Sequence, residues 1–334
     1  MDKIAMSTRE KMVELFMGAP EGLISGEQLS SALGVSRTAI WKHIKLLEED
    51  GFEFAATPRV GYRLTHVPDE LMASLVAPHL RDCTLGSQIL WAPERPSTND
   101  TATELAKSGA PHGLVVTAAR QTGGRGRQGR VWQSPAGGMW FSILVRRPCA
   151  ISQAGDLTLL ASVAVWRALA SMGIPAEIKW PNDLLLNGRK ICGILAQMRT
   201  DGESVEYAVI GIGMNANFTR EQFPPDVREY ATTILSEMNR EVHRPTLLGC
   251  ILTELDQLYR DLKAGVGGFA AVRDEWKAHA HTLGRNIRVR IGEQIVEGVA
   301  QDVDARGVLA LRGEDGTVHA IHSGEVLFSE MEKL

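Results

Sequence analysis

The segment 121–132, Q-T-G-G-R-G-R-Q-G-R-V-W, is the part of the sequence most suggestive of chemistry, because its glycines alternate with Arg125, Arg127 and Arg130. Glycine lets the backbone approach a ligand closely, and a guanidinium offers planar, bidentate donors to phosphate or carboxylate. The segment therefore predicts a loop that closes over an anion, although taken alone it also fits a solvated loop. It matches neither the Walker nor the Rossmann glycine pattern.

A second segment, 179–195, reads K-W-P-N-D-L-L-L-N-G-R-K-I-C-G-I-L. Its Asn187-Gly188 pair between two apolar runs predicts a two-residue β-hairpin, which places Lys190 on a strand just past the turn. A lone lysine in such a place is usually a solvated edge residue. Here Asp183 and Asn182 accompany it, so the set suits the activation of a carboxylate by ATP. That chemistry needs a cation near the α-phosphate, a carboxylate for Mg²⁺ and donors that align the reactants.

The elements that must position these residues alternate between helix and strand. Turn pairs at Asn187-Gly188 and Asp201-Gly202 predict antiparallel hairpins, which favour a mixed α+β sheet over a Rossmann fold. We expect a helix over 99–108 with Thr98 or Asn99 as its cap, and a second helix over 152–172. Strands are expected over 114–118, 139–145, 177–180, 184–195 and 205–212.

Both segments, in this order, resemble the central domain of the biotin protein ligases, the biotin–[acetyl-CoA-carboxylase] ligases. Pro96-Ser97-Thr98-Asn99 resembles the polar motif that helps to hold the biotin head group in that family, and 211–215 resembles its G-I-G-x-N strand end. Near the C-terminus, 298–300, 307–309 and 323–326 resemble the small C-terminal barrel. With the N-terminal region, the likeness covers nearly the whole chain and is to the bifunctional, repressor-type ligases.

The N-terminal region has the pattern of a winged helix-turn-helix. Ser25 and Gln28 form a capping-box pattern before one short helix, and Ser36 precedes a second helix with Ile40, Ile44 and Leu47 on its inner face. Two short strands, over 52–55 and 61–64, complete the unit. A helical protein-interaction domain is the alternative, but we favour DNA binding. The expected DNA-contacting residues are Ser36, Arg37, Thr38, Lys42, Lys45 and Arg59.

The resemblance implies an α+β multidomain fold. A winged helix-turn-helix domain is expected over 1–66, a mixed-sheet biotin/lipoate ligase-like catalytic domain over 67–282, and a small SH3-like β-barrel over 283–334. A chain of 334 residues with 44% hydrophobic content is long enough for two or three packed domains.

The resemblance also implies roles for the site residues. Lys190, Arg125, Arg127 and Asp183 are the expected catalytic set, with Asp183 holding Mg²⁺ directly or through water. Biotin is expected to contact Ser97, Thr98, Asn99, Gln121, Gly124, Arg125, Arg127 and Lys190. ATP is expected to contact Arg125, Arg127, Arg130, Trp132, Lys179, Asn182, Asp183, Lys190 and Asn215. The loosely matching stretch 218–233 does not identify the residue that stacks on adenine.

The implied reaction joins biotin and MgATP into biotinyl-5′-AMP, which then biotinylates a lysine of the biotin carboxyl carrier domain of acetyl-CoA carboxylase or a related carboxylase. As a repressor, the chain is expected to bind operator DNA as a homodimer promoted by biotinyl-AMP. Three alternatives stay open: a ligase whose winged helix no longer regulates, a lipoate ligase, and a non-catalytic biotin-sensing repressor. The G-R-G-R-x-G-R motif favours biotin over lipoate, and the presence of Lys190 and Asp183 favours an active enzyme.

Composition limits the other classes of function. Four cysteines without C-x-x-C spacing predict neither a disulfide framework nor a zinc site. The sequence has no signal-peptide pattern and no long apolar run, so we expect a cytoplasmic protein without a membrane partner. Its net charge of −4 gives no general attraction to nucleic acid, so DNA binding must be local.

Overall fold

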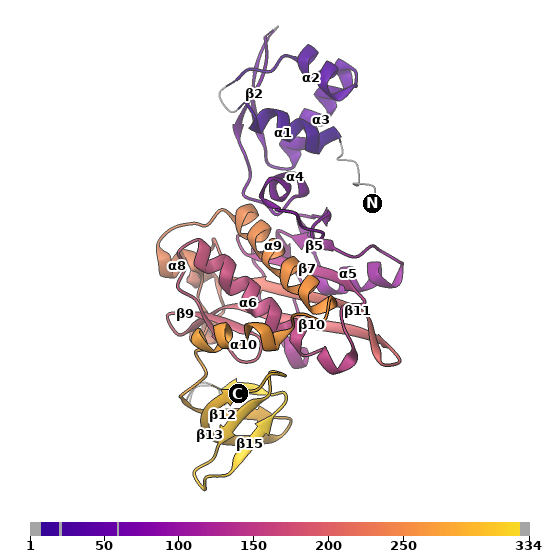
Figure 1. The fold of residues 1–334 in the computed structure, drawn as a ribbon. Helices are drawn as coiled ribbons and strands as arrows, with labels where there is room; N and C mark the ends of the chain where they lie inside the picture. The colour runs from indigo at the N-terminus through magenta and orange to yellow at the C-terminus, as the bar shows by residue number, and fades with distance from the viewer. Residues whose placement is uncertain (1–7, 20–21, 59, 328–334) are drawn as a thin grey trace.

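The computed structural model describes residues 8–19, 22–58 and 60–327, which form an N-terminal helical unit, a large central unit and a small C-terminal β unit in a row (Figure 1). The N-terminal unit is built from three helices and a two-stranded antiparallel wing. Its elements are α1 (Thr8–Met17), α2 (Gly26–Leu33), α3 (Arg37–Glu49), β1 (Glu53–Thr57) and β2 (Gly61–His66).

Local sequence signals explain the helix boundaries of this unit. Ser25 and Gln28 make both hydrogen bonds of a capping box at the start of α2, and Gly34 ends that helix with a left-handed φ of 68°. The Ser36 side chain accepts a hydrogen bond from the Ala39 N–H and caps α3. The sequence-based prediction of a winged helix-turn-helix is therefore confirmed. The inward faces form one buried cluster with Ile40, Ile44, Leu47, Phe52 and Phe16 among its members.

A short helix, α4 (Ala73–Val76), joins the N-terminal unit to the central one (Figure 1). Met72 and Leu75 belong to the buried cluster of the N-terminal unit, whereas Leu71 and Val76 belong to the core of the central unit. The junction therefore contributes to two cores at once. The winged unit is packed against the rest of the chain and not merely tethered to it.

The central unit contains a seven-stranded mixed sheet with the order β3-β5-β7-β11-β10-β9-β8. Only β3 and β5 pair in parallel among these neighbours. The strands are β3 (Gln88–Leu90), β5 (Leu114–Ala118), β7 (Met139–Arg146), β8 (Glu177–Lys179), β9 (Asp183–Leu186), β10 (Arg189–Asp201) and β11 (Ser204–Met214). Two further short strands, β4 (Glu94–Arg95) and β6 (Arg120–Gln121), pair in parallel beside it.

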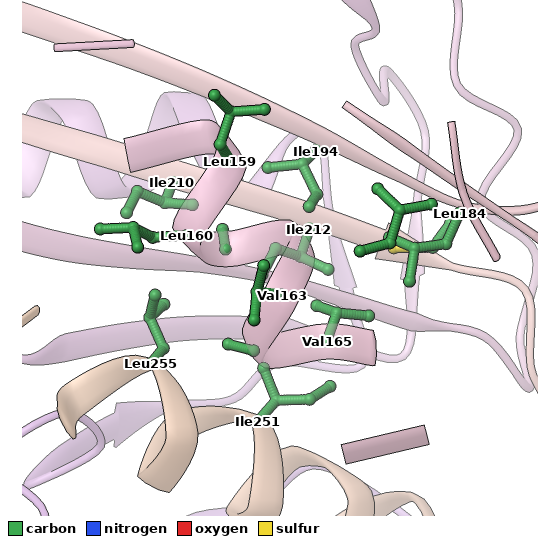
Figure 2. Close-up of a cluster of buried hydrophobic side chains, with 14 of the residues drawn as sticks. Leu159, Leu160, Val163, Val165, Leu184, Ile194, Ile210, Ile212, Ile251 and Leu255 are labelled. Carbon is green, nitrogen blue, oxygen red and sulfur yellow. The ribbon is translucent and has the colours of Figure 1, made fainter. Parts of the chain in front are cut away.

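Helices cover both faces of this sheet. On one face lie α6 (Asp156–Ser171), α9 (Arg244–Lys263) and α10 (Phe269–Ala278). Figure 2 shows Val163 of α6 between Ile212 of the sheet and Ile251 of α9, all of them buried. On the other face α5 (Thr98–Lys107) packs through Ala102 and Ala106. Two short helices, α7 (Pro225–Arg228) and α8 (Ile234–Met238), lie between β11 and α9 in the sequence.

The C-terminal unit is a five-stranded antiparallel sheet with the order β15-β14-β13-β12-β16. Its strands are β12 (Asn286–Ile291), β13 (Gln294–Val303), β14 (Leu309–Arg312), β15 (Val318–Ile321) and β16 (Glu325–Leu327). The buried indole N–H of Trp180, at the end of β8, donates to the Gly307 carbonyl at 2.9 Å and ties this unit to the central sheet. The expected three-part α+β fold is thus present.

Two predicted helix boundaries need correction. The helix expected over 99–108 begins at Thr98. Its cap is Ser97 and not Thr98 or Asn99, because the Ser97 hydroxyl accepts from the Asp100 N–H. The helix expected over 152–172 is α-helical only over Asp156–Ser171, and a 3₁₀ turn, Ile151–Gln153, precedes it. Within the described residues, no helix has the length and apolar character needed to cross a membrane.

Candidate active site

A cleft of about 540 Å³ lies on the α5 face of the central sheet, between the arginine loop 121–132 and the C-terminal unit. Thirteen of the residues expected to act on biotin or ATP line it together. They are Ser97, Thr98, Asn99, Gln121, Arg125, Arg127, Arg130, Trp132, Lys179, Asn182, Asp183, Lys190 and Asn215. Gly124 is not among the residues that line the cleft, and a Cβ there would lie 2.4 Å from the Trp132 carbonyl oxygen. Its glycine is needed for the close packing of the loop on itself.

One end of the cleft is a fixed network of uncharged polar groups. The Gln121 Oε1 atom accepts from the Thr98 N–H at 2.8 Å and lies 3.1 Å from the Thr98 hydroxyl. The Gln121 amide nitrogen donates to Ser134 at 2.8 Å. Ser142, fully buried on β7, donates to Asn99 at 2.5 Å and lies 2.8 Å from the Thr98 hydroxyl. This end can hold a neutral polar ring, such as a urea, by preorganised hydrogen bonds.

The floor of the cleft is made of glycines on β10 and β11. A Cβ at Gly211 would lie 2.0 Å from the Asn99 Oδ1 atom, and a Cβ at Gly213 would lie 2.4 Å from the Trp132 Nε1 atom. Gly193, paired with Gly213 across the two strands, would place a Cβ 2.9 Å from the same indole. The G-I-G pattern therefore lets Asn99 and Trp132 lie directly on the sheet. The buried Trp132 Nε1 has no hydrogen-bond partner among the described residues.

Lys190 follows the hairpin turn, in which Asn187 and Gly188 have φ angles of 50° and 75°. Both values are positive, as a type I′ turn requires, so the predicted hairpin is confirmed. A register shift in the pairing follows directly after Lys190, and such bulges re-aim side chains near functional sites. The ammonium lies 2.7 Å from Asp183 Oδ1 and 5.1 Å from the centre of a Trp132 ring. A cation and a carboxylate therefore share the middle of the cleft.

The backbone around Lys190 is held by the loop that follows β11. The Lys190 N–H donates to the Tyr230 carbonyl at 2.8 Å, and the Lys190 carbonyl accepts from the Thr232 N–H at 3.0 Å. Asn215 donates to the Thr232 carbonyl at 3.0 Å, and its Oδ1 atom is buried without a hydrogen-bond partner among the described residues. This second loop, residues 218–233, thus braces the lysine.

The arginine loop spans the cleft and is attached at both sides. Arg125 pairs with Asp100 of α5 at 2.9 Å. Arg127 donates to Asn182 Oδ1 at 2.9 Å and to the Gly324 carbonyl at 3.1 Å, and Arg130 pairs with Glu325 of β16. All three guanidiniums therefore lie at the cleft, as anion binding requires.

Several lining residues were not predicted from the sequence. Phe223, Asp226, Val227, Glu229, Tyr230 and Ala231 line the cleft from the second loop, and Arg290, Glu325, Val326 and Leu327 line it from the C-terminal unit. Ser142 was also missed, although a polar residue inside the apolar run 139–145 was a usable signal. The C-terminal residues gave no local signal, because only the folded chain brings them to the arginine loop.

Five of the six expected DNA-contacting residues belong to α3 or cap it. This helix lies in the N-terminal unit, at the opposite end of the row from the C-terminal sheet (Figure 1). Arg37 pairs with Glu27 at 2.8 Å and Lys45 with Glu48 at 2.5 Å, while Thr38 and Lys42 are exposed on the same helix. Ser36 caps the helix. Arg59 lies outside the described residues.

Comparisons with known proteins agree with this geometry. Residues 91–215 match the biotin/lipoate A/B protein ligase family, residues 8–63 match an HTH domain, and residues 282–329 match the biotin protein ligase C-terminal domain. The biotin protein ligase of Aquifex aeolicus in complex with biotin and ATP is 26% identical, with a TM-score of 0.61 over 72% of this chain and 97% of that one.

The chain belongs to the biotin protein ligase family. Within that family, the bifunctional ligase/repressor BirA of Bacillus subtilis is 38% identical over 95% of this chain and 98% of its own length. BirA of Escherichia coli is 30% identical over 92% of this chain and 94% of its own. The biotin–[acetyl-CoA-carboxylase] ligase of Paracoccus denitrificans, 33% identical, covers 70% of this chain. The resemblance to repressor-type ligases is confirmed.

Proposed function

We propose that this chain is an ATP-dependent biotin protein ligase that also represses transcription. The main observation in support of ligase activity is the Lys190–Asp183 pair. It lies beneath the arginine loop, in the same cleft as the Gln121–Thr98 network. Biotin held by its head group at the neutral polar end would direct its carboxylate toward the Lys190 ammonium. ATP and biotin bind to the structural relative from Aquifex aeolicus, which supports the same substrates here.

In the first step, a biotin carboxylate oxygen attacks the α-phosphorus of ATP, and pyrophosphate leaves. Ser97, Thr98, Asn99 and Gln121 hold the head group, and the Lys190 ammonium neutralises charge shared by the carboxylate and the α-phosphate. The ATP-contacting residues are Lys179, Asn182, Asn215 and Trp132, together with the three loop arginines. The product is the mixed anhydride biotinyl-5′-AMP.

In the second step, the ε-amine of a lysine on the carrier domain attacks the anhydride carbonyl, and AMP leaves. The amine loses its proton as the amide forms, and Lys190 stabilises the developing charge. Arg125 and Arg127 close over the adenylate, which excludes water and restrains its escape. The enzyme needs no nucleophile of its own, because the acceptor lysine supplies it.

Mg²⁺ accompanies ATP in this proposal. No group of three or more His, Cys, Asp or Glu side chains able to hold a metal is present among the described residues. Asp183 is one of the carboxylates that line the cleft, and Mg²⁺ commonly takes one or two carboxylates, water and substrate phosphates. The residues therefore fit a magnesium ion brought by ATP and held by Asp183 directly or through water. When bound, the ion supplies charge neutralisation on the phosphates.

The test is transfer to an acceptor. The purified chain, MgATP and biotin are incubated with an apo biotin carboxyl carrier domain, and the carrier is examined by mass spectrometry. We expect one added biotinyl group on one lysine, and none on a carrier with that lysine replaced by arginine. Modification by lipoate in place of biotin would contradict the substrate assignment.

The proposal extends to regulation. We assign DNA binding to the unit expected over 1–66, catalysis to 67–282 and the barrel to 283–334, in a homodimer that biotinyl-AMP promotes and that binds operator DNA in the cytoplasm. The HTH match and the ligase/repressor relatives support the DNA half. Sedimentation with biotin and MgATP, compared with sedimentation without them, tests the dimer: an unchanged monomer would contradict it.

A further inference from the structure

Trp41 is the most exposed tryptophan of the seven in the chain, with a relative exposure of 52%. Trp140, Trp180 and Trp276 are fully buried, and the other three are half-buried. Trp41 lies on α3, one helical turn after Arg37 and Thr38 and one turn before Lys45, so these side chains share one stripe of the helix surface. Nothing in the proposed ligase chemistry uses this indole.

The helix presents Trp41 on a rigid support. The inner face of α3 is fixed by Ile40, Ile44 and Leu47, which are at most 3% exposed, and the Ser36 cap fixes its first turn. A tryptophan has only two side-chain torsions, so it loses little conformational freedom when it meets a partner. A single exposed apolar side chain is common and does not by itself indicate a binding site. The charged residues around Trp41 are the evidence for its role.

The charges on α3 are unevenly distributed. Arg37, Lys42 and Lys45 lie within its first nine residues, whereas the acidic Glu48 and Glu49 end the helix and Asp50 follows. A helix that meets the polyanionic backbone of DNA benefits from cations at the end that enters the groove and loses from carboxylates there. The N-terminal half of α3, which carries Trp41, is therefore the end that fits the major groove.

An indole in the major groove would have one specific apolar target. The major groove presents one apolar group, the C5-methyl of thymine, and apolar side chains read it by contact. Hydroxyl and cationic neighbours at Thr38, Lys42 and Lys45 suit phosphates and hydrogen-bonding base edges. A protein partner would have to cover the same cations at a desolvation cost, so DNA is the better match.

We propose that Trp41 is a specificity residue that reads a thymine methyl group in the major groove of the operator. The proposal rests on the proposed DNA-binding function. It adds an apolar contact to the polar residues already assigned to α3.

The test begins by selecting duplexes from a pool with a random central region, using the full-length protein with biotin and MgATP. Wild type, W41A and W41F are then titrated with an enriched duplex and with an unrelated duplex of equal length at one salt concentration. We expect W41A to lose about tenfold in affinity for the enriched duplex, which corresponds to about 1.4 kcal/mol, and nothing for the unrelated one. W41F should keep most of the affinity.

Replacing single thymines of the enriched duplex by 2′-deoxyuridine removes only the methyl group. Wild type should lose affinity at one or two positions, and W41A should be insensitive at those positions. Lys42→Ala is the control, because a lost phosphate contact weakens both duplexes alike and lowers the salt dependence. W41A should retain biotin-dependent ATP–pyrophosphate exchange, which shows that the variant is folded.

Equal selectivity of W41A and wild type would overturn the proposal, and so would a wild type indifferent to every deoxyuridine. If no sequence is enriched by the wild type, the DNA-binding function itself fails, and this inference fails with it. If W41A instead slows transfer to the carrier domain, Trp41 serves a protein contact and the proposal is wrong.

Discussion

Lys190 Nζ lies 2.7 Å from Asp183 Oδ1, and the two residues come from the two arms of one hairpin, β9 and β10. The tight Asn187-Gly188 turn and the bulge after Lys190 set this distance. Each residue therefore positions the other before substrates arrive, which lowers the reorganisation needed for charge stabilisation.

Lys190→Ala is expected to lower the rate of biotin-dependent adenylation by at least about 10²-fold, because removing one preorganised donor to a developing charge has that scale of effect. ATP–pyrophosphate exchange measures it, and circular dichroism shows whether the fold is kept. Lys277→Ala is a matched control, since Lys277 pairs with Asp302 away from the cleft. Full activity of Lys190→Ala would remove the main assignment.

Gly213→Ala should displace Trp132, because the new methyl group would lie 2.4 Å from the indole Nε1 atom. We expect kcat/KM for ATP to fall about tenfold or more, since small misplacements of site residues are costly. Gly155→Ala is the control, because no atom lies within 4 Å of a Cβ at that position. Equal loss in both variants would show that the effect is not local.

Glu325→Gln weakens the attachment of the arginine loop to the C-terminal unit, because Glu325 pairs with Arg130 and, at 3.5 Å, with Arg290. The pairs are partly exposed, so the dissociation rate of bound biotinyl-AMP should rise only up to about fivefold. Filter binding with labelled adenylate measures this rate. Glu314→Gln, exposed in the same unit, should leave it unchanged, and an unchanged rate in Glu325→Gln would argue against a loop attachment.

Arg244 is 5% exposed and joins the linker to the central unit: its Nε donates to Asp69 at 2.7 Å and its Nη1 to the Gly138 carbonyl at 2.8 Å. Arg244→Ala should lower the free energy of unfolding by about 3 kcal/mol, because it leaves the partly buried Asp69 carboxylate without its cationic partner. Urea denaturation measures the change. Arg273→Ala, whose pair with Asp274 is exposed on one side, should cost less than about 0.5 kcal/mol.

Stability should fall as the pH drops below about 6.5, partly because of His112. Burial is the first cause that lowers the His112 pKa, and nearby Lys263 lowers it further. The Arg146 N–H also donates to His112 Nδ1 at 3.2 Å, which requires the neutral ring. The unfolded chain therefore binds the proton more readily than the fold does, so protonation favours unfolding. His112→Gln should show a flatter loss of urea stability between pH 7.5 and 5.5, and an identical pH dependence would contradict this account.

The hairpin and the caps of α2 and α3 were predictable because their causes are local. Asn187-Gly188 demands positive φ angles, and Ser25 and Ser36 cap the helices that they precede. The contribution of Glu325 was not predictable, because its partner Arg130 is 195 positions away and no local pattern pairs them. The residues of 218–233 that line the cleft were also not predictable, since that loop has no strong periodicity.

The predicted cap of α5, Thr98 or Asn99, was wrong, because the cap is Ser97. All three residues are capping types, and the local sequence does not choose among them. The folded chain decides it, because Thr98 and Asn99 are engaged by Gln121 and Ser142 and leave Ser97 to cap the helix. Contacts in the site therefore determine which residue caps α5, which helix-capping propensity alone does not.

The central claim is that this cleft activates biotin with ATP, and ATP–pyrophosphate exchange tests it without an acceptor protein. The purified chain is assayed with biotin, with lipoate and with neither. The account predicts exchange that depends on biotin and is lost in Lys190→Ala. Exchange stimulated by lipoate, or no exchange by a folded protein, would contradict it.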